Sequence, residues 1–504
     1  MLPQKKCVVV KIGSSSTIAG FNNTELPLCV LSSSYMLNKS SGTDKYIFGT
    51  TEMLEAAQSP AESKNNCQVL TTVDDSGIPY NWTVIELQLR HIYQNYLHCD
   101  PAEFPLVITA PALKSEIANK VLEKYLSLAF DKLNVPVAQV LIEPLALALA
   151  MGKSTALVVD MGASGCNVTP VVDGTVVRAG VMRSRFAGDF LDYHIATTVA
   201  QKAGGDVEMD TDAETNTSLA AWGDSHTWIQ DFKANMLQVS DKELQEVERF
   251  HREQAEMYIK QQEQLKQYST NNPAATLDDA AIASIYDNNP LSQERNFLYK
   301  QLHKTLSFQL RECNAIAEHL FDPSGLSDKY SRDDGLAEIV GKAIKKTGAT
   351  VSAAGTNALG SLGPAMTLLQ QQQQHQGNGS SLAPPTGAGA PGGGASSSTA
   401  GAAAGAAGAA GSMSSEQVYS SLLTNVIVTG ATSLIPGMEQ RIINELSVRF
   451  PQYKITTFAS QVTLDRKIQG WTSSVAMANL PSWELSKWFT KEGYHSELDA
   501  ITKE

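Results

Sequence analysis

The feature that most constrains the fold of this chain is a pattern that occurs twice: a strand-like apolar run enters a Gly/Ser turn and returns as a second strand. The copies lie at residues 7–21 (CVVVKIGSSSTIAGF) and 156–174 (ALVVDMGASGCNVTPVVDG). Glycine lets backbone N–H groups approach a phosphate closely, and serine adds a hydroxyl donor. The residues of this kind in the two turns are Gly13, Ser14, Ser15, Gly162 and Ser164. One such turn is usually only a hairpin, whereas two turns facing each other across a cleft can clamp a nucleotide tail.

Strand and helix patterns alternate along much of the remaining chain. Short β-branched runs bounded by Gly or Pro occupy residues 8–12, 105–109, 156–160 and 425–429. Helical apolar patterns lie at residues 145–151 and 437–450. This alternation predicts an α/β architecture. Because 504 residues are too many for one compact core, we expect two large lobes or several domains.

Two segments differ from this pattern. Residues 347–415 contain no charged side chain and almost nothing large and apolar to bury, so we expect a disordered insertion that acts as a linker or a surface loop. Residues 240–268 predict a long polar helix that opens with a capping box of Ser240 and Glu243 and projects from the body. Such a helix is either a solvated surface element or a binding site for a partner. Residues 271–292 predict a second loop.

Charge and cysteine content narrow the range of partners. The chain has 39 Lys and Arg against 52 Asp and Glu, and its net charge of −13 disfavours a general basic face for DNA or an anionic membrane. Six scattered cysteines without a CxxC pair argue against a disulfide framework and a structural zinc site. No apolar run reaches the ~18 residues that span a bilayer, and the first apolar run is too short for a signal peptide. We therefore expect a soluble nucleocytoplasmic protein.

A third element makes the two turns more specific. Residues 425–446 (NVIVTGATSLIPGMEQRIINEL) predict a strand, a small-residue turn at Gly430 and a helix, and residues 142–152 (IEPLALALAMG) precede the second Gly/Ser turn. In this order the segments resemble the actin, Hsp70 and sugar kinase superfamily, with two phosphate loops, a connecting helix and an adenosine loop. Residues 465–494 resemble the C-terminal end of actin specifically.

Within this superfamily the chain resembles the nuclear actin-related protein 7 group of fungal SWI/SNF and RSC chromatin remodellers. The segments that carry the resemblance are YNW at 80–82, FDKLNVPV at 130–137, DMGASGCNVTP at 160–170, KQQEQLKQ at 260–267 and IPGMEQRIINELSVRFPQYK at 435–454. The resemblance implies an actin-like fold of two lobes, with duplicated RNase H-like domains around a nucleotide cleft. It implies a first lobe at 1–155, a second lobe at 156–346 and 416–470 with a polar helical insertion near 240–292, a disordered insertion at 347–415, and a C-terminal segment at 471–504 that returns to the first lobe.

The resemblance also implies which residues line the cleft. The cofactor-binding positions are Gly13, Ser14, Ser15, Asp160, Gly162, Ser164, Lys233 and Gly430. Several positions depart from the family pattern: Lys11 replaces an Asp, Ala163 a carboxylate, Asn167 a His, Ala234 a Glu and Ala431 a Gly. Lys11 cannot hold hydrated Mg²⁺; it either meets phosphates as a point charge or reaches solvent from the end of a strand.

These departures imply weak or structural ATP binding, little or no hydrolysis, no catalytic residue and no metal site. Glu143, which Pro144 follows, is either a base for water or an ordinary helix start. The alternative from the enzyme class is a weak ATPase of the actin/Hsp70 superfamily that uses Glu143 and Asp160.

Finally, the resemblance implies partners and a location. A hydrophobic cleft at one end of the molecule would be lined by Leu149, Gly174, Met477, Leu480 and Trp483. The alternative for Met477, Leu480 and the tryptophan is that they are simply core residues. The resembled group binds there the helix that precedes the motor ATPase, alongside a second actin-related protein. We therefore expect a nuclear scaffold subunit that contacts these partners and other remodeller subunits, touches DNA only indirectly and supports nucleosome remodelling and transcription regulation. Polymerisation like that of actin is disfavoured, because the two insertions would protrude near subunit contacts.

Overall fold

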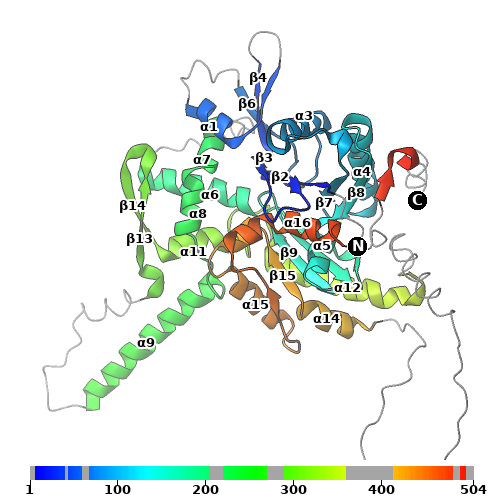
Figure 1. Cartoon of the computed structure of the whole chain (residues 1–504). Coiled ribbons are helices and arrows are strands. Elements are labelled where there is room, and N and C mark those ends of the chain that lie inside the picture. The colour runs from blue at the N-terminus through cyan, green and yellow to red at the C-terminus, as the bar shows by residue number, and fades with distance from the viewer. Residues whose placement is uncertain are drawn as a thin grey trace, which may run out of the picture.

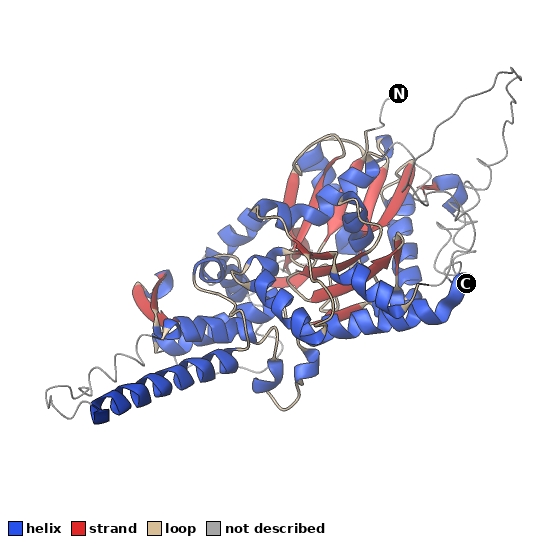
Figure 2. Cartoon of the chain, turned by 90° about the horizontal axis from the view of Figure 1, so that it is seen from below, coloured by secondary structure: helices blue, strands red, loops and turns tan. Residues whose placement is uncertain are grey.

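Two β-sheets, one built mainly from each half of the chain, form the frame of the molecule (Figure 1). The computed structural model describes residues 6–39, 44–58, 67–204, 219–268, 289–358, 413–480 and 488–494. Helices flank the sheets when the molecule is seen from below (Figure 2). The predicted α/β architecture is therefore confirmed.

The first sheet has the strand order β17-β8-β7-β1-β2-β3. Strands β1 (Val8–Ile12) and β2 (Ser16–Phe21) form the first predicted hairpin, and β7 (Leu106–Ala110) runs parallel to β1. The other strands are β3 (Cys29–Ser32), β8 (Val137–Ile142) and β17 (Trp488–Thr490). The central strands are almost wholly buried, which explains why they appear in the sequence as continuous apolar runs.

The second sheet repeats this plan, with the order β11-β10-β9-β15-β16 and with β12 paired to β10. Strands β9 (Ala156–Met161) and β10 (Cys166–Val172) form the second hairpin, and β15 (Val426–Thr429) runs parallel to β9, as β7 does to β1. The other strands are β11 (Thr175–Val176), β12 (Met182–Ser184) and β16 (Thr457–Phe458). The two Gly/Ser turns thus occupy equivalent positions in the two sheets.

Helices α5 (Glu143–Ala150) and α16 (Thr463–Ala478) join the two sheets. Helix α5 follows β8 of the first sheet and packs against β9 and β10 of the second, while α16 contacts α5, β1, β7 and β15. Trp471 of α16 is completely buried, and its indole N–H donates to the Val9 carbonyl at 3.0 Å. The two lobes therefore share a packed helical connection.

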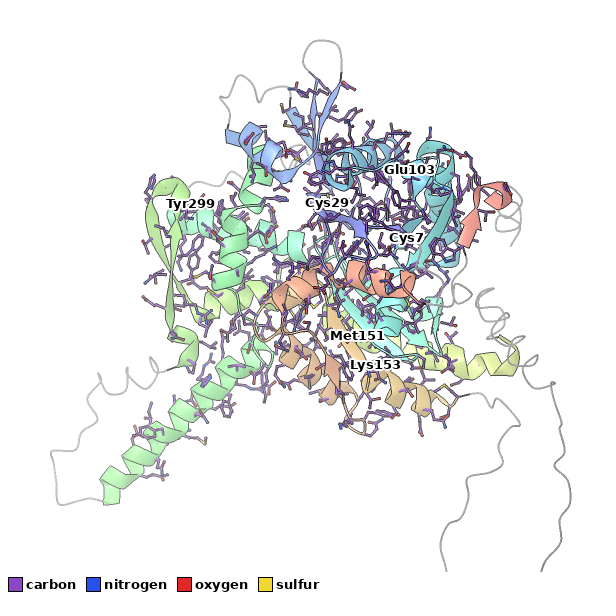
Figure 3. All side chains as sticks on the ribbon, in the orientation of Figure 1. Cys7, Cys29, Glu103, Met151, Lys153 and Tyr299 are labelled. Atoms are coloured by element: carbon purple, nitrogen blue, oxygen red, sulfur yellow. The ribbon has the colours of Figure 1, made fainter. Side chains whose placement is uncertain are left out.

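The remaining elements extend this frame, and each lobe has its own buried apolar cluster. Cys29 belongs to the cluster of the first lobe and Tyr299 to that of the second (Figure 3). The additional strands are β4 (Ser34–Asn38), β5 (Lys45–Ile47) and β6 (Cys67–Thr71) in a three-stranded sheet, and β13 (Glu294–Tyr299) and β14 (Lys304–Gln309) in a hairpin. The additional α-helices are α1 (Thr50–Gln58), α3 (Trp82–Ile92), α4 (Ser115–Ser127), α6 (Gly188–Ala203), α7 (Leu219–Ser225), α8 (Trp228–Asn235), α9 (Leu244–Tyr268), α11 (Leu310–Glu318), α12 (Leu336–Ala358), α14 (Ser415–Leu423) and α15 (Met438–Arg449).

The strands and helices predicted around the three turns are confirmed. Strand β1 has the predicted bounds, β7 is shifted by one residue at both ends, β9 ends one residue later and β15 begins one residue later than predicted. Helix α5 begins two residues before its prediction, and α15 is one residue shorter at each end.

The long polar helix exists, but its predicted start at residue 240 is wrong. Helix α9 begins at Leu244, and the predicted capping box is not formed. Instead, the Glu243 carboxylate accepts a hydrogen bond from Arg332 at 2.8 Å, and Ser240 is buried with its carbonyl accepting from Arg441. A tertiary partner, Arg332, has thus taken the Glu243 carboxylate that was predicted to take part in the cap. Beyond its base, α9 projects from the body, as predicted (Figure 2).

The prediction that disorder begins at residue 347 is also wrong. Residues 347–358 are the second half of α12. Thr347 and Val351 are buried, and a Cβ at Gly348 would overlap the ring of Tyr419 on α14. Helix α12 therefore packs against α14 at the start of this uncharged stretch. Residues 359–412 lie outside the described residues, as do residues 269–288, which hold most of the predicted loop at 271–292.

One predicted domain boundary needs correction. The division between residues 470 and 471 falls inside α16, a continuous helix that contacts both lobes. Strand β17 pairs antiparallel with β8 and so completes the first sheet. In the described part of the chain, no helix combines the length and the apolar character that crossing a membrane requires.

Candidate functional site

The two Gly/Ser turns meet between the lobes. In each turn the glycine N–H closes the hairpin: Gly13 donates to the Ser16 carbonyl and Gly162 to the Gly165 carbonyl, both at 3.0 Å. The Ser164 N–H donates to the hydroxyl of Ser14 at 3.3 Å, across 150 residues of sequence. The structure therefore brings the two predicted phosphate loops into contact, with small side chains and hydroxyl groups on both sides.

Ser33, together with Gln88 of α3, holds the backbone of the first loop in place. The Ser33 hydroxyl donates to the Gly13 carbonyl at 2.6 Å, and the Ser33 N–H donates to the Ser15 carbonyl at 3.0 Å. Gln88 of α3 in turn donates to the Ser32 carbonyl at 2.9 Å and accepts from Thr17. These buried bonds fix the backbone of the loop while leaving its serine hydroxyls at the cleft.

Lys11, Glu143 and Asp160 form a charged cluster beside the two loops. Lys11 comes from β1, Glu143 is the first residue of α5, and Asp160 lies near the end of β9. The Lys11 ammonium forms an ion pair with the Glu143 carboxylate, and the two side chains are only 16% and 18% exposed. Two alternatives were stated for Lys11: contact with phosphates, or exposure to solvent at the end of a strand. Neither of them included this ion pair. Glu143 does begin a helix with Pro144 in its first turn, and it also lies in the site.

Burial and mutual charge set the protonation of this cluster. Burial acts to lower the pKa of Lys11, but the charges of Glu143 and Asp160 outweigh it, so the pKa is raised and Lys11 is an ammonium at neutral pH. Burial and the Glu143 charge raise the pKa of Asp160 to about 6, against the opposing charges of Lys11 and Arg183. Keeping Asp160 ionised in the folded state therefore costs free energy.

A testable consequence is that Asp160→Asn stabilises the protein at neutral pH. Because the folded pKa is raised above the ordinary value of 3.8, Asp160 contributes stability at pH below about 4, and that contribution is lost as pH rises through about 6. Allowing for solvent screening, we expect a gain of about 1–2 kcal/mol at pH 7.5 that disappears at pH 4. Urea unfolding at both pH values measures it. The exposed Asp173→Asn serves as the control, and an equal effect at both pH values would contradict the expectation.

Arg183 lies in the candidate site, although the sequence analysis did not single it out. Its guanidinium donates to Ser164 Oγ at 2.9 Å, to Asn167 Oδ1 at 2.9 Å and to the Asp75 carbonyl at 2.9 Å. A Cβ at Gly165 would overlap the guanidinium. The signal in the sequence was indirect, because Arg183 lies on β12, and only the pairing of β12 with β10 places it opposite Asn167. Arg183 and Ser164 also line a cavity of about 590 Å³ next to the second loop.

The third turn closes the other side of the second loop. Gly430 has φ 88° and ψ 153°, a conformation open almost only to glycine, and a Cβ there would lie 2.6 Å from Asp160 Oδ1. The Thr432 hydroxyl donates to the Gly162 carbonyl at 2.7 Å. Lys233 pairs with Asp192 and donates to the Gly188 carbonyl at 2.8 Å.

All eight predicted cofactor-binding residues therefore lie in one connected region. Gly188 links Lys233 to the rest, because its N–H donates to the Gly162 carbonyl at 3.2 Å. Ala431 begins the 3₁₀ turn that follows Gly430.

The site suits a phosphate chain better than a divalent cation. Backbone amides, serine hydroxyls and Arg183 are phosphate donors that carry no negative charge. Mg²⁺ prefers oxygen ligands, but the Lys11 ammonium already pairs with Glu143, and its positive charge also acts on Asp160 and would repel a second cation. Within the described ranges, no group of three or more His, Cys, Asp and Glu side chains is arranged to hold a metal ion.

The residues predicted to bind a partner lie around the ends of α5 and α16. Leu149 and Leu480 are 38% and 36% exposed, and Met477 is partly buried against the cluster around Trp471. Gly174 lies in the turn after β10, where its N–H donates to the Ser154 carbonyl at 2.7 Å. Met151 and Lys153, labelled in Figure 3, mark the C-terminal end of α5. Trp483 lies outside the described residues, and binding at these positions stays a prediction.

Comparison with known proteins gives one family. The family model described as Actin matches residues 3–359 and 363–503. The chain is 49% identical over 499 residues, 98% of its length and 97% of the relative, to Actin-related protein 7 of Saccharomyces cerevisiae. It is 24% identical over 508 residues, 97% of this chain and 94% of the relative, to Actin-related protein 4 of Eremothecium gossypii. It is 30% identical over 189 residues, 37% of this chain and 42% of the relative, to the SWI/SNF and RSC complexes subunit arp42 of Schizosaccharomyces pombe.

Proposed function

The chain belongs to the actin family, and from this premise we propose that it is a largely non-catalytic scaffold subunit of an ATP-dependent chromatin remodelling complex. It pairs with a second actin-related protein, binds the helix that precedes the motor ATPase and works in the nucleus. The proposal is supported by its likeness to Actin-related protein 7 and to a protein named as a subunit of the SWI/SNF and RSC complexes.

The observation that carries the non-catalytic part is the ion pair of Lys11 with Glu143. Hydrolysis of a nucleotide in an actin-like cleft needs a metal held by carboxylates and a side chain that orients the attacking water. Lys11 pairs with Glu143, the side chain considered above as a base for water, and its positive charge also acts on Asp160. The loops retain their phosphate donors, so the cleft is proposed to bind a nucleotide weakly and to keep it intact.

The partner surface is proposed on apolar exposure and charge. Leu149 and Leu480 expose apolar side chains at the ends of α5 and α16, which is the chemistry that accepts the apolar face of an amphipathic helix. A net charge of −13 favours protein partners and leaves contact with DNA to other subunits of the complex.

The test is purification of the tagged full-length chain from fungal nuclear extract. We expect the motor ATPase and a second actin-related protein, identified by mass spectrometry, and we expect the association to be lost when the helix preceding the motor is deleted. If the chain purifies without either protein, the scaffold role is wrong.

A single substitution sharpens this test. We expect Leu149→Asp to reduce recovery of the motor about 10-fold or more, because burying an unpaired carboxylate in an apolar interface costs on the order of 2 kcal/mol or more. Leu298→Asp is the matched control: Leu298 is 55% exposed on β13, in the second lobe. Equal recovery with the two variants would contradict the assignment of this surface.

The second candidate is a weak ATPase, which the position of Glu143 beside Asp160 favours. Phosphate release by the purified chain decides between the two. We expect none above background, and turnover that Glu143→Ala abolishes would establish the enzyme instead.

A further inference from the structure

One ammonium and two carboxylates meet where the two lobes face each other, and they come from both lobes. Lys11 lies on β1 of the first sheet, Glu143 begins α5, which joins the sheets, and Asp160 lies on β9 of the second sheet. Lys11 pairs directly with Glu143, and its charge also acts on Asp160. One side chain thus opposes the repulsion between two carboxylates that belong to different lobes.

The backbone encloses this cluster from two sides. A Cβ at Gly470 of α16 would lie 2.7 Å from the Lys11 Nζ, and a Cβ at Gly430 would lie 2.6 Å from Asp160 Oδ1. Both elements can approach so closely only because these positions are glycine. Mg²⁺ sheds its water reluctantly and needs room for several water ligands. An ammonium group therefore fits this enclosed site better than a hydrated Mg²⁺ ion does.

Two positively charged side chains already act on Asp160. Glu143 and Asp160 contribute two negative charges when ionised, and Lys11 and Arg183 contribute two positive charges that act on Asp160. Arg183 is also bonded to the second loop through Ser164, so one of the two cations is tied to the phosphate-loop backbone. A phosphate chain entering between Ser14 and Ser164 would replace the hydrogen bond between them and would meet the Arg183 cation beside Ser164.

We propose that Lys11 is a built-in replacement for the divalent cation, so that the cleft keeps the two lobes together and accepts a nucleoside polyphosphate free of metal. The inference rests on the proposed non-hydrolysing role, because a permanent ammonium supports binding without the ligand geometry that hydrolysis requires. It adds a property that the non-hydrolysing role does not require. Nucleotide binding and the contact between the two lobes are both independent of Mg²⁺.

The experiment follows thermal unfolding of the purified full-length chain, with EDTA or with millimolar Mg²⁺, and with or without ATP. For the unsubstituted protein we expect the same melting temperature with EDTA and with Mg²⁺, and a rise of about 2–5 °C on adding ATP under both conditions. A rise that vanishes in EDTA overturns the proposal, and so does the absence of any rise.

The decisive variant is Lys11→Ala, which leaves Glu143 and Asp160 as unpaired oxygen ligands. We expect a lower melting temperature in EDTA, recovery of several degrees with Mg²⁺, and binding of about one equivalent of Mn²⁺ by electron paramagnetic resonance where the unsubstituted chain binds none. If Lys11→Ala does not fold in EDTA, we expect Mg²⁺ to restore native circular dichroism during refolding. A variant that gains no response to either cation overturns the proposal.

Two controls complete the design. Lys11→Arg keeps the cation and is expected to remain indifferent to Mg²⁺. Lys202→Ala removes a more exposed ion pair with Glu312, of 2.6 Å, in the second lobe, and is expected to gain no metal response. The outcome is distinct from that of the scaffold test: a chain that purifies with the motor but loses ATP binding in EDTA contradicts this inference alone.

Discussion

Replacing Arg441 by alanine is expected to lower the free energy of unfolding by about 3–5 kcal/mol, because it leaves the largely buried Glu318 carboxylate without its arginine partner and leaves Glu445 with Arg449 alone. The Arg441 side chain is only 2% exposed. Its guanidinium donates to both Glu318 oxygens at 2.6 and 3.0 Å, to Glu445 at 2.7 Å and to the Lys242 carbonyl at 2.7 Å. It thus connects α15 to α11 and to the segment that leads into α9. Urea unfolding followed by circular dichroism measures the loss.

The neighbouring Gln440→Ala provides the control for this prediction. Gln440 is exposed on the same helix and bonds only to the Asn444 amide in its own helix, at 2.9 Å. We expect a change within about 0.5 kcal/mol. If Arg441→Ala cost no more than Gln440→Ala, the charged cluster would contribute nothing to the second lobe.

The second large effect is expected from Gly430→Ala, at about 2–4 kcal/mol. The backbone at Gly430 lies in a region that costs other residues on the order of 1–3 kcal/mol. The new Cβ would in addition overlap the Met161 carbonyl and approach Asp160 Oδ1, neither of which can move without disturbing β9. Any stabilisation by ATP is expected to be lost as well, since the third turn and the second loop are displaced together.

Gly204→Ala separates the two contributions. Gly204 also has a positive φ, 81°, but a Cβ at this position would have no atom of the described residues within 4 Å. We expect a loss of only about 1 kcal/mol there. A loss at Gly430 no larger than at Gly204 would mean that the turn moves freely away from β9.

The sequence was most informative where structure is local. The hairpins around Gly13 and Gly162 were predictable because strand, turn and returning strand are adjacent in the chain. The start of α9 was not, because Glu243 pairs with Arg332, 89 residues away, instead of capping its own helix. The continuation of α12 past residue 347 was not predictable either, because it involves packing of Gly348 against Tyr419 of α14, a residue distant in the sequence.

In the candidate site, too, the features that depend on residues distant in the sequence could not be predicted. The phosphate-loop residues were identifiable from their small side chains and their position after a strand. The Lys11–Glu143 pair joins residues 132 apart, and its existence decides whether Glu143 is free to act on water. Arg183 was overlooked because its role depends on a three-residue strand that only the folded sheet places beside Asn167.

The late position of β17 and α16 in the chain also bears on how the protein is made. Strand β17 pairs with β8, and α16 covers Val9 and Val107 of the first sheet, although both elements follow that sheet by more than 300 residues. At typical rates of synthesis, on the order of 20–70 s separate the appearance of β8 on the ribosome from that of β17. During this interval the first lobe presents an uncovered apolar face and an open strand edge. The nascent chain is therefore expected to need a chaperone that holds it until its last elements emerge.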